Sequence, residues 1–528
     1  MAGENPAGTS SSGLFKLTEN SGRWLLATTT IASGMTFLVG SAIGVALPVI
    51  QSYFNAPLSG IQWVASAYLV SLSALILIGG ALGDHFGRKR IFNVGVIIFF
   101  VGEALSSASP DIGFLIAFQG LAGIGSALMV PQSLAIINAS FVSSERGRVI
   151  GLWAGLSGAV SAGAPWIGGL LTQISWRAVF FIPLPLCFLI LWLSRRYIPE
   201  NPTRAERPPN WWLSISIFAG LAAITFALIE APVWGFTDPP IIAAMVAGAM
   251  LLVLFAVLDR RFARPILPPS LFKSPLVTGA NLATLLLYFS LNGTIYFTVL
   301  NLQQVQGFSP STAGLSLLPS VLIIMLLSGA FGSLADRIGP RTQMIAGPLV
   351  VASGIGLLAL SGVRANYWIT FFPGLVLIGL GMSAVIAPLT KSALSVNETA
   401  SGAASGLNNA VARIAALLAV ALLGAVMATV FSTRLEQAID NTSLSSSQRQ
   451  EILDQSEKVG AVVIPADFGN EARMSAESAV KSSFVYSFRW VMGTAGVLAV
   501  GAAGVSFVTI HNPRGQGEPP EYRGRKKT

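Results

Sequence analysis

The sequence carries very little charge. Only 10% of its 528 residues are Asp, Glu, Lys or Arg, whereas 53% are hydrophobic, and the mean hydropathy is +0.69. A typical soluble domain has about 25% charged residues. A chain of this composition cannot cover a water-facing surface with polar groups, so we expect most of its surface to face lipid.

Cysteine and histidine are nearly absent. The single cysteine, Cys187, lies in an apolar run, and the two histidines, His85 and His511, lie near expected helix ends. One cysteine excludes an intrachain disulfide, and two distant histidines argue against a haem or histidine–metal site in the membrane. Since no nucleophile, base or metal cluster is expected at membrane depth either, we expect no cofactor and no enzyme activity.

The hydrophobic residues lie in runs long enough to cross a bilayer, which takes about 20 residues each. These runs fall near 24–50, 62–82, 92–109, 112–138, 148–171, 178–197, 211–231, 240–258, 277–302, 312–335, 343–363, 367–390, 403–430 and 484–510. They predict an all-α integral membrane protein with about fourteen transmembrane helices. The polar remainder predicts a disordered tail over 1–22, an outside loop over 431–483 that holds one or two short surface helices, and a basic tail over 512–528.

Basic residues are distributed unevenly between the loops. If the N-terminus is cytoplasmic, most of the 32 Lys and Arg residues fall on that side. The positive-inside rule then predicts that both termini lie in the cytoplasm. This asymmetry explains the net charge of +9 without nucleic acid. The expected partners are the lipid bilayer and a small-molecule substrate, with the chain as a monomer.

One polar motif occurs twice. Residues 80–90 read GALGDHFGRKR and residues 332–342 read GSLADRIGPRT, so both copies contain G-x-L-x-D-x-x-G. Each copy lies between two long apolar runs, which indicates an internally duplicated membrane protein. Glycines permit tight turns and close helix approach. A carboxylate is favoured beside a helix N-terminus, and an arginine can bridge to a carbonyl or an acid.

These turns are expected to control opening on the cytoplasmic side, with a rigid turn as the alternative. The expected gating residues are Gly80, Asp84, Gly87 and Arg88, with Gly332, Asp336, Arg337 and Gly339 in the second copy.

Further stretches extend the pattern. Residues 155–169 end in APWIGG, residues 401–409 read SGAASGLNN, and residues 302–304 read LQQ. With the repeated turn, they make the chain, from about 24 to 510, resemble the major facilitator superfamily and its fourteen-helix drug:proton antiporter branch. The resemblance implies two six-helix halves, over 23–200 and 276–511, with two extra helices within 201–275. It also implies a multi-pass protein of the cytoplasmic membrane.

The run at 155–169 resembles the antiporter motif of that branch. Its matching residues are Gly155, Gly163, Pro165, Gly168 and Gly169. Glycines allow close helix packing, and proline removes a backbone donor and can bend the helix. We expect a moving seam between the halves here, with ordinary tight packing as the alternative.

The chain departs from the branch at two positions. Val39 occupies the place of an acid in the first helix, and Gln119 that of an arginine in the fourth. The double change is physically coherent, because one charge left alone at mid-membrane would cost at least ~2.5–3.5 kcal/mol. The usual proton relay is therefore missing.

Few other charges lie within the runs. Glu103, expected midway along the third helix, and Glu230, near the outer end of the seventh, are proton-site candidates by default. A polar contact to a neighbouring helix is the alternative for Glu103, and an interfacial position for Glu230. Arg413 is expected to be structural.

A polar stripe marks the expected substrate pathway. Asn281, Tyr288, Asn292 and Tyr296 are spaced by seven, four and four residues, so they share one helix face. The resemblance implies that this helix lines the pathway, with Val39, Tyr68 and Gln119 approaching from the other half. Bonding between helices is the alternative.

The sequence thus predicts export of hydrophobic or amphipathic small molecules by alternating access, with proton coupling left open. The alternative is an uncoupled facilitator or importer of a neutral solute.

Overall fold

The computed structural model describes residues 14–200, 211–261, 265, 269–396 and 401–510. Apart from an isolated bridge between Phe15 and Phe141, the regular structure of these residues is helical. The elements are α1 (Asn20–Phe54), α2 (Leu58–Phe86), α3 (Arg88–Ser107), α4 (Ile112–Ser140), α5 (Ser143–Ile174), α6 (Trp176–Phe181), α7 (Pro183–Tyr197), α8 (Trp211–Trp234), α9 (Pro239–Arg261), η1 (Pro269–Lys273), α10 (Pro275–Leu300), η2 (Asn301–Val305), α11 (Pro310–Ser316), α12 (Leu318–Ile338), α13 (Pro340–Ala359), η3 (Tyr367–Phe371), α14 (Phe372–Ala393), α15 (Ser401–Asp440), α16 (Ser446–Leu453), η5 (Ser456–Ala461) and α17 (Asn470–Thr509).

The all-α membrane fold is confirmed. Within the described ranges, 13 helical segments are long and apolar enough to cross a membrane. The remaining predicted run, 148–171, lies in α5, whose 32 residues span about 48 Å at 1.5 Å per residue. The predicted run 178–197 is divided between α6 and α7, and Pro183, which has no N–H to donate, begins the second helix.

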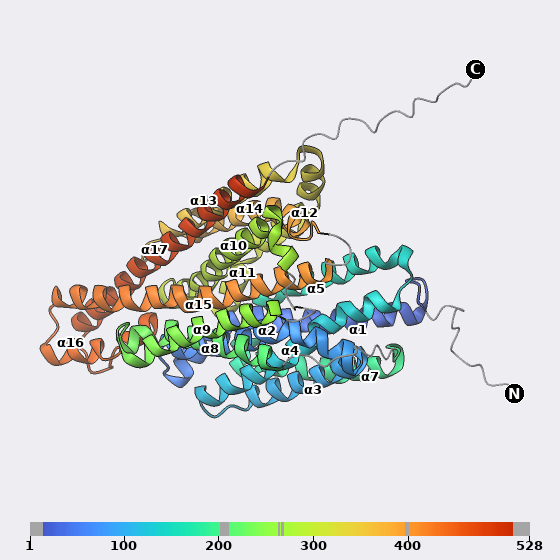
Figure 1. The fold of residues 1–528 in the computed structure, drawn as a ribbon. Helices are drawn as coiled ribbons and strands as arrows, with labels where there is room; N and C mark the ends of the chain where they lie inside the picture. The colour runs from blue at the N-terminus through green and yellow to red at the C-terminus, as the bar shows by residue number, and fades with distance from the viewer. Residues whose placement is uncertain (1–13, 201–210, 262–264, 266–268, 397–400, 511–528) are drawn as a thin grey trace, which may run out of the picture.

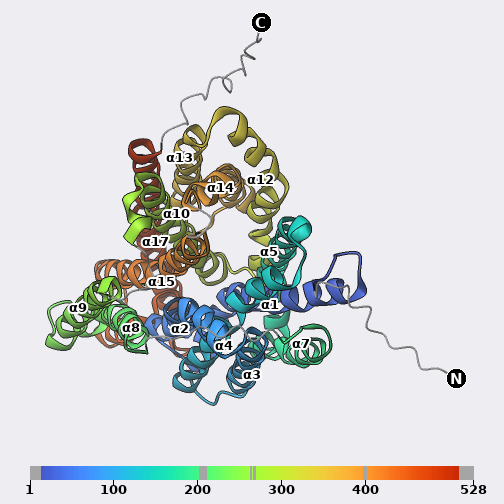
Figure 2. The same cartoon turned by 45° about the vertical axis from the view of Figure 1, so that its right-hand side comes forward.

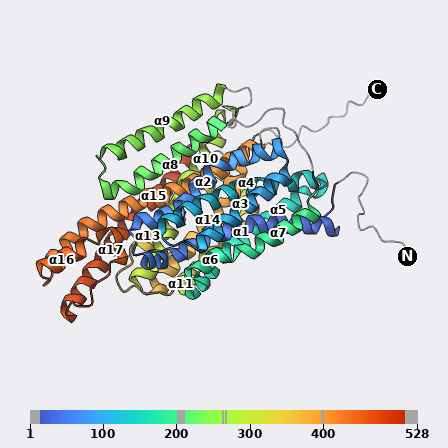
Figure 3. The same ribbon diagram turned by 90° about the horizontal axis from the view of Figure 1, so that it is seen from below.

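The helices form two groups with an added pair. Figure 1 shows α1–α7 together in the lower part of the view, and α10–α14 with α17 in the upper part. The helix α15 packs on α10 and α17 and also on α2 of the other group. The pair α8 and α9 packs against α2 and α15 through α8, along one side of the molecule (Figures 2 and 3).

The two groups approach each other at one end of the molecule. In Figure 1 they lie close together near α16 and diverge toward the first residues of α1 and the last residues of α17. We call these the closed end and the open end. At the open end, side chains added at Gly147, Gly151, Gly155 or Gly158 of α5 would meet no other atom within 4 Å.

Glutamine side chains join the halves toward the closed end. We call them the glutamine seam: Gln51, Gln62, Gln173, Gln303 and Gln304. Their amides donate six hydrogen bonds across the interface, to Lys458 O, Val420 O, Ser309 Oγ, Ser311 Oγ, Val45 O and Gln51 Oε1. All the donors are neutral, so no ion pair has to be separated when these bonds break.

The repeated motif forms the same turn twice. Gly87 follows α2 and Gly339 follows α12, and they have φ values of 99° and 86°. Positive φ strongly favours glycine, because any Cβ would be strained there. The internal duplication seen in the sequence is therefore also a duplication of backbone conformation, and both turns lie at the open end.

Two predicted segment boundaries are wrong. Residues 14–22 do not belong to a disordered tail. The Phe15 N–H donates to Ser140 O at 2.7 Å, the Leu17 N–H donates to the Glu145 carboxylate at 2.6 Å, and α1 begins at Asn20. The outside loop predicted over 431–483 has other bounds, because α15 continues to Asp440 and α17 already begins at Asn470. The one or two short helices expected within this loop are α16 and η5. Residues 1–13 and 512–528 lie outside the described residues.

The Gly87 turn generates a first prediction. Gly87→Ala should lower the free energy of unfolding by about 1–3 kcal/mol, because alanine is strained at this φ. A Cβ at Gly87 would meet no atom within 4 Å, so the loss would come from the backbone alone. Thermal unfolding in detergent measures it. Gly147→Ala, within α5, is the control and should stabilise by about 0.5–1 kcal/mol; equal effects would contradict the argument.

Candidate functional site

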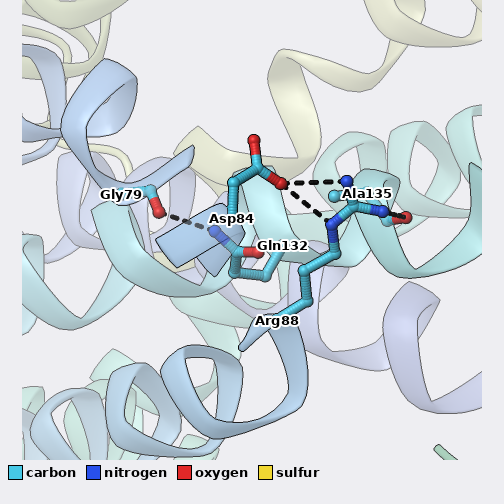
Figure 4. A network of polar contacts seen from close by, with 5 residues as sticks. All are labelled: Gly79, Asp84, Arg88, Gln132 and Ala135. Carbon is cyan, nitrogen blue, oxygen red and sulfur yellow. Dashed lines mark hydrogen bonds and ion pairs between the residues drawn. The ribbon is translucent and has the colours of Figure 1, made fainter. Parts of the chain in front are cut away.

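The first copy of the motif ties three helices of one half together (Figure 4). The Asp84 carboxylate pairs with the Arg88 guanidinium at 2.9 Å, and Arg88 also donates to Ala135 O of α4 at 3.1 Å. Gln132 of α4 donates to Gly79 O of α2 at 2.6 Å. The sequence predicts an acidic or a carbonyl partner for Arg88; the structure has one of each, both in the same half as Arg88, and the gating role stays a prediction.

The second copy makes different contacts. Pro340 stands where Arg88 stands in the first copy, and Arg341 donates to Phe507 O of α17 at 3.1 Å. Arg337 is exposed, and a Cβ at Gly332 would lie 3.3 Å from the side chain of Ala387. The side chain of Asp336 lies outside the described residues. The two copies share their turn but differ in the polar contacts they make.

The antiporter-like motif of α5 is divided between two environments. A Cβ at Gly314 of α11 would strike the Pro165 carbonyl, one at Gly169 would strike the backbone of Pro310, and one at Gly168 would strike Ala42. Toward the open end, a Cβ added at Gly163 would lie near only a side chain of α5 itself, and one added at Gly155 would meet no atom within 4 Å. The contacts of Pro165 and Gly169 with α11 are thus close backbone contacts between the halves, whereas that of Gly168 with Ala42 of α1 lies within the first half. Its role as a moving seam stays a prediction.

The Glu103 carboxyl group is buried without a partner. Glu103 is fully buried in α3, neither of its oxygens has a well-formed hydrogen bond within the described structure, and the Gln119 side chain is the polar group beside it. Glu103 lies four residues before the end of α3, not midway along the helix as predicted, because α3 ends at Ser107. Nearby Gln119 of α4 donates to Ser106 Oγ at 2.9 Å. Gln119 thus faces α3.

One face of α1 remains accessible between the halves. We call Phe37, Gly40, Ser41 and Gly44 the central face; they follow the i, i+3, i+4, i+7 spacing of one helix side, and none is buried. A Cβ at Gly44 would meet no atom within 4 Å. Val39 is fully buried and lies off this face.

Arg413 of α15 lies across from the central face. Its guanidinium carbon is 4.8 Å from the centre of the Phe37 ring, a cation–π contact between the halves. Tyr68 and Tyr288 lie within electrostatic range of this guanidinium. The Tyr68 hydroxyl is already bonded, to Thr36 O at 3.2 Å and with Ser126 Oγ at 3.0 Å.

Only part of the predicted polar stripe of α10 lies near Arg413. Asn281 and Asn292 donate to carbonyls of their own helix, at Val277 and Tyr288. The Tyr296 hydroxyl is buried without a hydrogen-bond partner among the described residues, whereas Tyr288 is partly exposed and near Arg413. Of the four, Tyr288 is the residue placed near Arg413. A transport role for the stripe stays a prediction.

Glu230 has a specific partner that the sequence did not indicate. The Trp63 indole N–H of α2 donates to the Glu230 carboxylate at 2.7 Å, which links the added helix α8 to the first half. Phe37 was also missed, because an aromatic residue within an apolar run carries no signal in a single sequence.

The repeated turn and the two helix groups can be compared with known protein families. A family model described as Major Facilitator Superfamily matches residues 29–420. The chain belongs to the major facilitator superfamily. It is therefore a multi-pass membrane transporter of small molecules, and the family consists of transporters rather than enzymes.

Several curated relatives are resistance or export proteins. The chain is 31% identical over 428 residues to the multidrug resistance protein Stp of Mycobacterium tuberculosis, covering 80% of this chain and 79% of that one. It is 29% identical to the tetracenomycin C resistance and export protein of Streptomyces glaucescens, over 92% of this chain and 91% of that one. It is 33% identical to a puromycin resistance protein of Streptomyces alboniger, over 76% and 81%.

Solved transporters share the fold. A bacterial homologue of the human lysosomal transporter Spinster, in an inward-facing and occupied conformation, superposes with a TM-score of 0.67 and 16% identity. That match covers 93% of this chain and 97% of the other. A bacterial homologue of human peptide transporters superposes with a TM-score of 0.57 and 15% identity, over 92% and 98%. At these identities the likeness establishes the fold alone.

The Asp84–Arg88 pair generates a second prediction. Asp84→Asn keeps the size of the side chain but removes the charge that holds Arg88, so we expect transport to fall strongly while expression and substrate affinity persist. Flux and binding measured on the same preparation separate the two effects. Glu477→Gln, which breaks an exposed i,i+4 ion pair with Arg473 at the closed end, is the control. Normal flux in Asp84→Asn would remove the gating role.

Proposed function

We propose that this protein exports hydrophobic or amphipathic small molecules from the cytoplasm by alternating access. The observation that supports it best is the asymmetric joining of the halves: the glutamine seam and the α5–α11 backbone contacts lie toward one end, and the other end diverges. A rocking motion would exchange the open and closed ends. Relatives whose names record resistance and export favour outward transport.

The open end is assigned to the cytoplasm by charge. The described turns and helix ends there carry a large set of basic residues, which includes Arg88, Lys89, Arg90, Arg146, Arg148, Arg195, Arg196, Arg260, Arg261, Arg337, Arg341 and Lys391. The positive-inside rule favours the cytoplasmic side for such an end. Both termini then face the cytoplasm, and the bacterial relatives suggest the cytoplasmic membrane.

The hydrogen bonds of the glutamine seam are weak enough to break and re-form as the closed end opens and closes. A hydrogen bond between transmembrane helices contributes about 0.6 kcal/mol on average and rarely more than about 1.7 kcal/mol. Six such bonds can therefore be exchanged for bonds to water within the few kcal/mol that binding of a substrate supplies. An ion pair in the same place would be more costly to separate, since each charge would have to be solvated alone.

Flux in proteoliposomes tests the proposed function. The full chain would be reconstituted and assayed with lipophilic cations and neutral amphipathic compounds, with and without a proton gradient. Movement of these compounds, dependent on the protein, is the expected result. A protein that carries small neutral solutes but no amphipathic compound would instead support the facilitator or importer, which the neutral Val39 and Gln119 positions favour.

Glu103 is proposed as the proton site if transport follows the proton gradient. A carboxyl group buried without a cation favours its neutral, protonated form, and Glu103 has no cation beside it among the described residues. Glu103→Gln mimics that form, so it should abolish gradient-driven accumulation and spare downhill exchange. Glu230→Gln is the comparison. Gradient-driven flux that survives Glu103→Gln would move the proton site to Glu230 or a loop carboxylate.

The seam generates a further prediction. Gln173 donates to both Ser309 and Ser311, so Gln173→Ala should weaken the closed end and shift the population toward molecules in which this end is open. Spin labels on cysteines replacing Ile174 and Leu360, both exposed, would report a longer distance by pulsed electron resonance. Gln437→Ala, which removes a bond within α15, should leave the distribution unchanged. No shift with Gln173→Ala would mean that the seam does not hold this end.

A further inference from the structure

Among the described residues, Arg413 is a cation without a paired anion. Within the described chain, its guanidinium makes no hydrogen bond or ion pair, and its recorded contact is with the face of Phe37 at 4.8 Å. The side chain is partly exposed rather than sealed in the protein. An arginine keeps its charge in proteins, so this position holds a permanent positive charge that faces the space beside the central face.

The surroundings do not balance this charge. A charge within the membrane carries a free-energy cost that a single cation–π contact does not fully offset. Glu103 is fully buried in α3, beside Gln119 of α4. It makes no ion pair with Arg413. The position in α1 where the sequence resemblance implies an acid is occupied by Val39, which is uncharged. The titratable groups that lie near Arg413 are Tyr68 and Tyr288, which are neutral phenols at ordinary pH.

The groups beside Arg413 fit an amphipathic ligand. Phe37 offers an aromatic surface, and Gly40 and Gly44 leave α1 without side chains that would occupy the space. The Tyr288 hydroxyl makes no hydrogen bond to the described residues, whereas that of Tyr68 is already bonded. An apolar body against α1 would therefore bring one polar group to Arg413 and Tyr288, both of which can donate to an anion.

We propose that Arg413, assisted by the Tyr288 hydroxyl, binds an acidic group of the substrate. The preferred compounds would then carry a carboxylate, or another acidic group of similar size, on an aromatic or aliphatic body. This inference rests on the proposed export function and narrows it, because the lipophilic cations that a general exporter would carry offer nothing for this arginine to bind.

Two dyes that differ in one group can test the proposal. Tetramethylrhodamine carries a free carboxylate, and its methyl ester does not. Fluorescence anisotropy would measure the binding of each to the full chain in phosphatidylcholine nanodiscs, with empty nanodiscs subtracted. We expect the wild type to bind the free acid at least about tenfold more tightly than the ester, as a charge-assisted hydrogen bond would give. Equal affinities would overturn the proposal whatever the variants do.

Variants assign the preference to a residue. Arg413→Gln should bring the ratio of the two affinities close to one, and Arg413→Lys should retain part of it. Tyr288→Phe should reduce the ratio of the two affinities about two- to threefold, as expected for the loss of one hydrogen bond. This variant tests the proposal if Arg413→Gln does not fold. Arg489→Gln, at a second arginine in the same half that donates to Ser361 O at 3.2 Å, is the control and should keep the ratio. A folded Arg413→Gln protein with the wild-type ratio would contradict the proposal.

Two further arms separate the possible failures. Added phosphatidylglycerol should leave the preference for the acid intact; if it abolishes the preference, Arg413 binds a lipid headgroup and not a substrate. Binding of neither dye by the wild type would count against the proposed function itself. Binding of both dyes with equal affinity would leave that function standing and remove only the role of Arg413.

Discussion

The arrangement of the whole molecule depends on neutral hydrogen bonds between its halves. Glutamine amides cross the interface toward one end, and close backbone contacts between α5 and α11 accompany them. Each amide bond is weak compared with an ion pair, and none leaves a charge behind when it breaks. Among the described residues these bonds lie toward the closed end, where the two groups are closest, and the groups diverge toward the open end.

The scarcity of charge inside the membrane gives each remaining charge a specific environment. Glu230 accepts a hydrogen bond from Trp63, and Arg489 donates to a backbone carbonyl. Among the described residues Glu103 has no well-formed hydrogen bond and Arg413 no ion pair; they lie on α3 and α15 and make no ion pair with each other. Val39 and Gln119, at the two positions where the sequence resemblance implies an acid and an arginine, are neutral and supply no counter-charge to either residue. Glu103 and Arg413 are the natural places to look for coupling and for selectivity.

The sequence was sufficient for the fold but only partly for the site. Long apolar runs, a repeated glycine turn and the uneven basic residues predict the helices and their duplication, because the bilayer constrains backbone and charge so strongly. The Asp84–Arg88 contact follows from local spacing. The pairing of Phe37 with Arg413 could not be predicted, since it depends on how two helices of different halves rotate. The same limit explains why Asn281 and Asn292 bond to their own helix despite sharing a stripe with Tyr288.

The close contact between Pro165 of α5 and Gly314 of α11 has a mechanical consequence. With no side chain between the two backbones, this point can act as a fulcrum near one end of a helix. About 22 residues of α5, or about 33 Å, lie between it and the open end. A rotation of only about 10° about the fulcrum would carry the far end of that lever about 6 Å, roughly one helical turn. A small slip between two backbones is thereby amplified into an opening on the scale of a ligand.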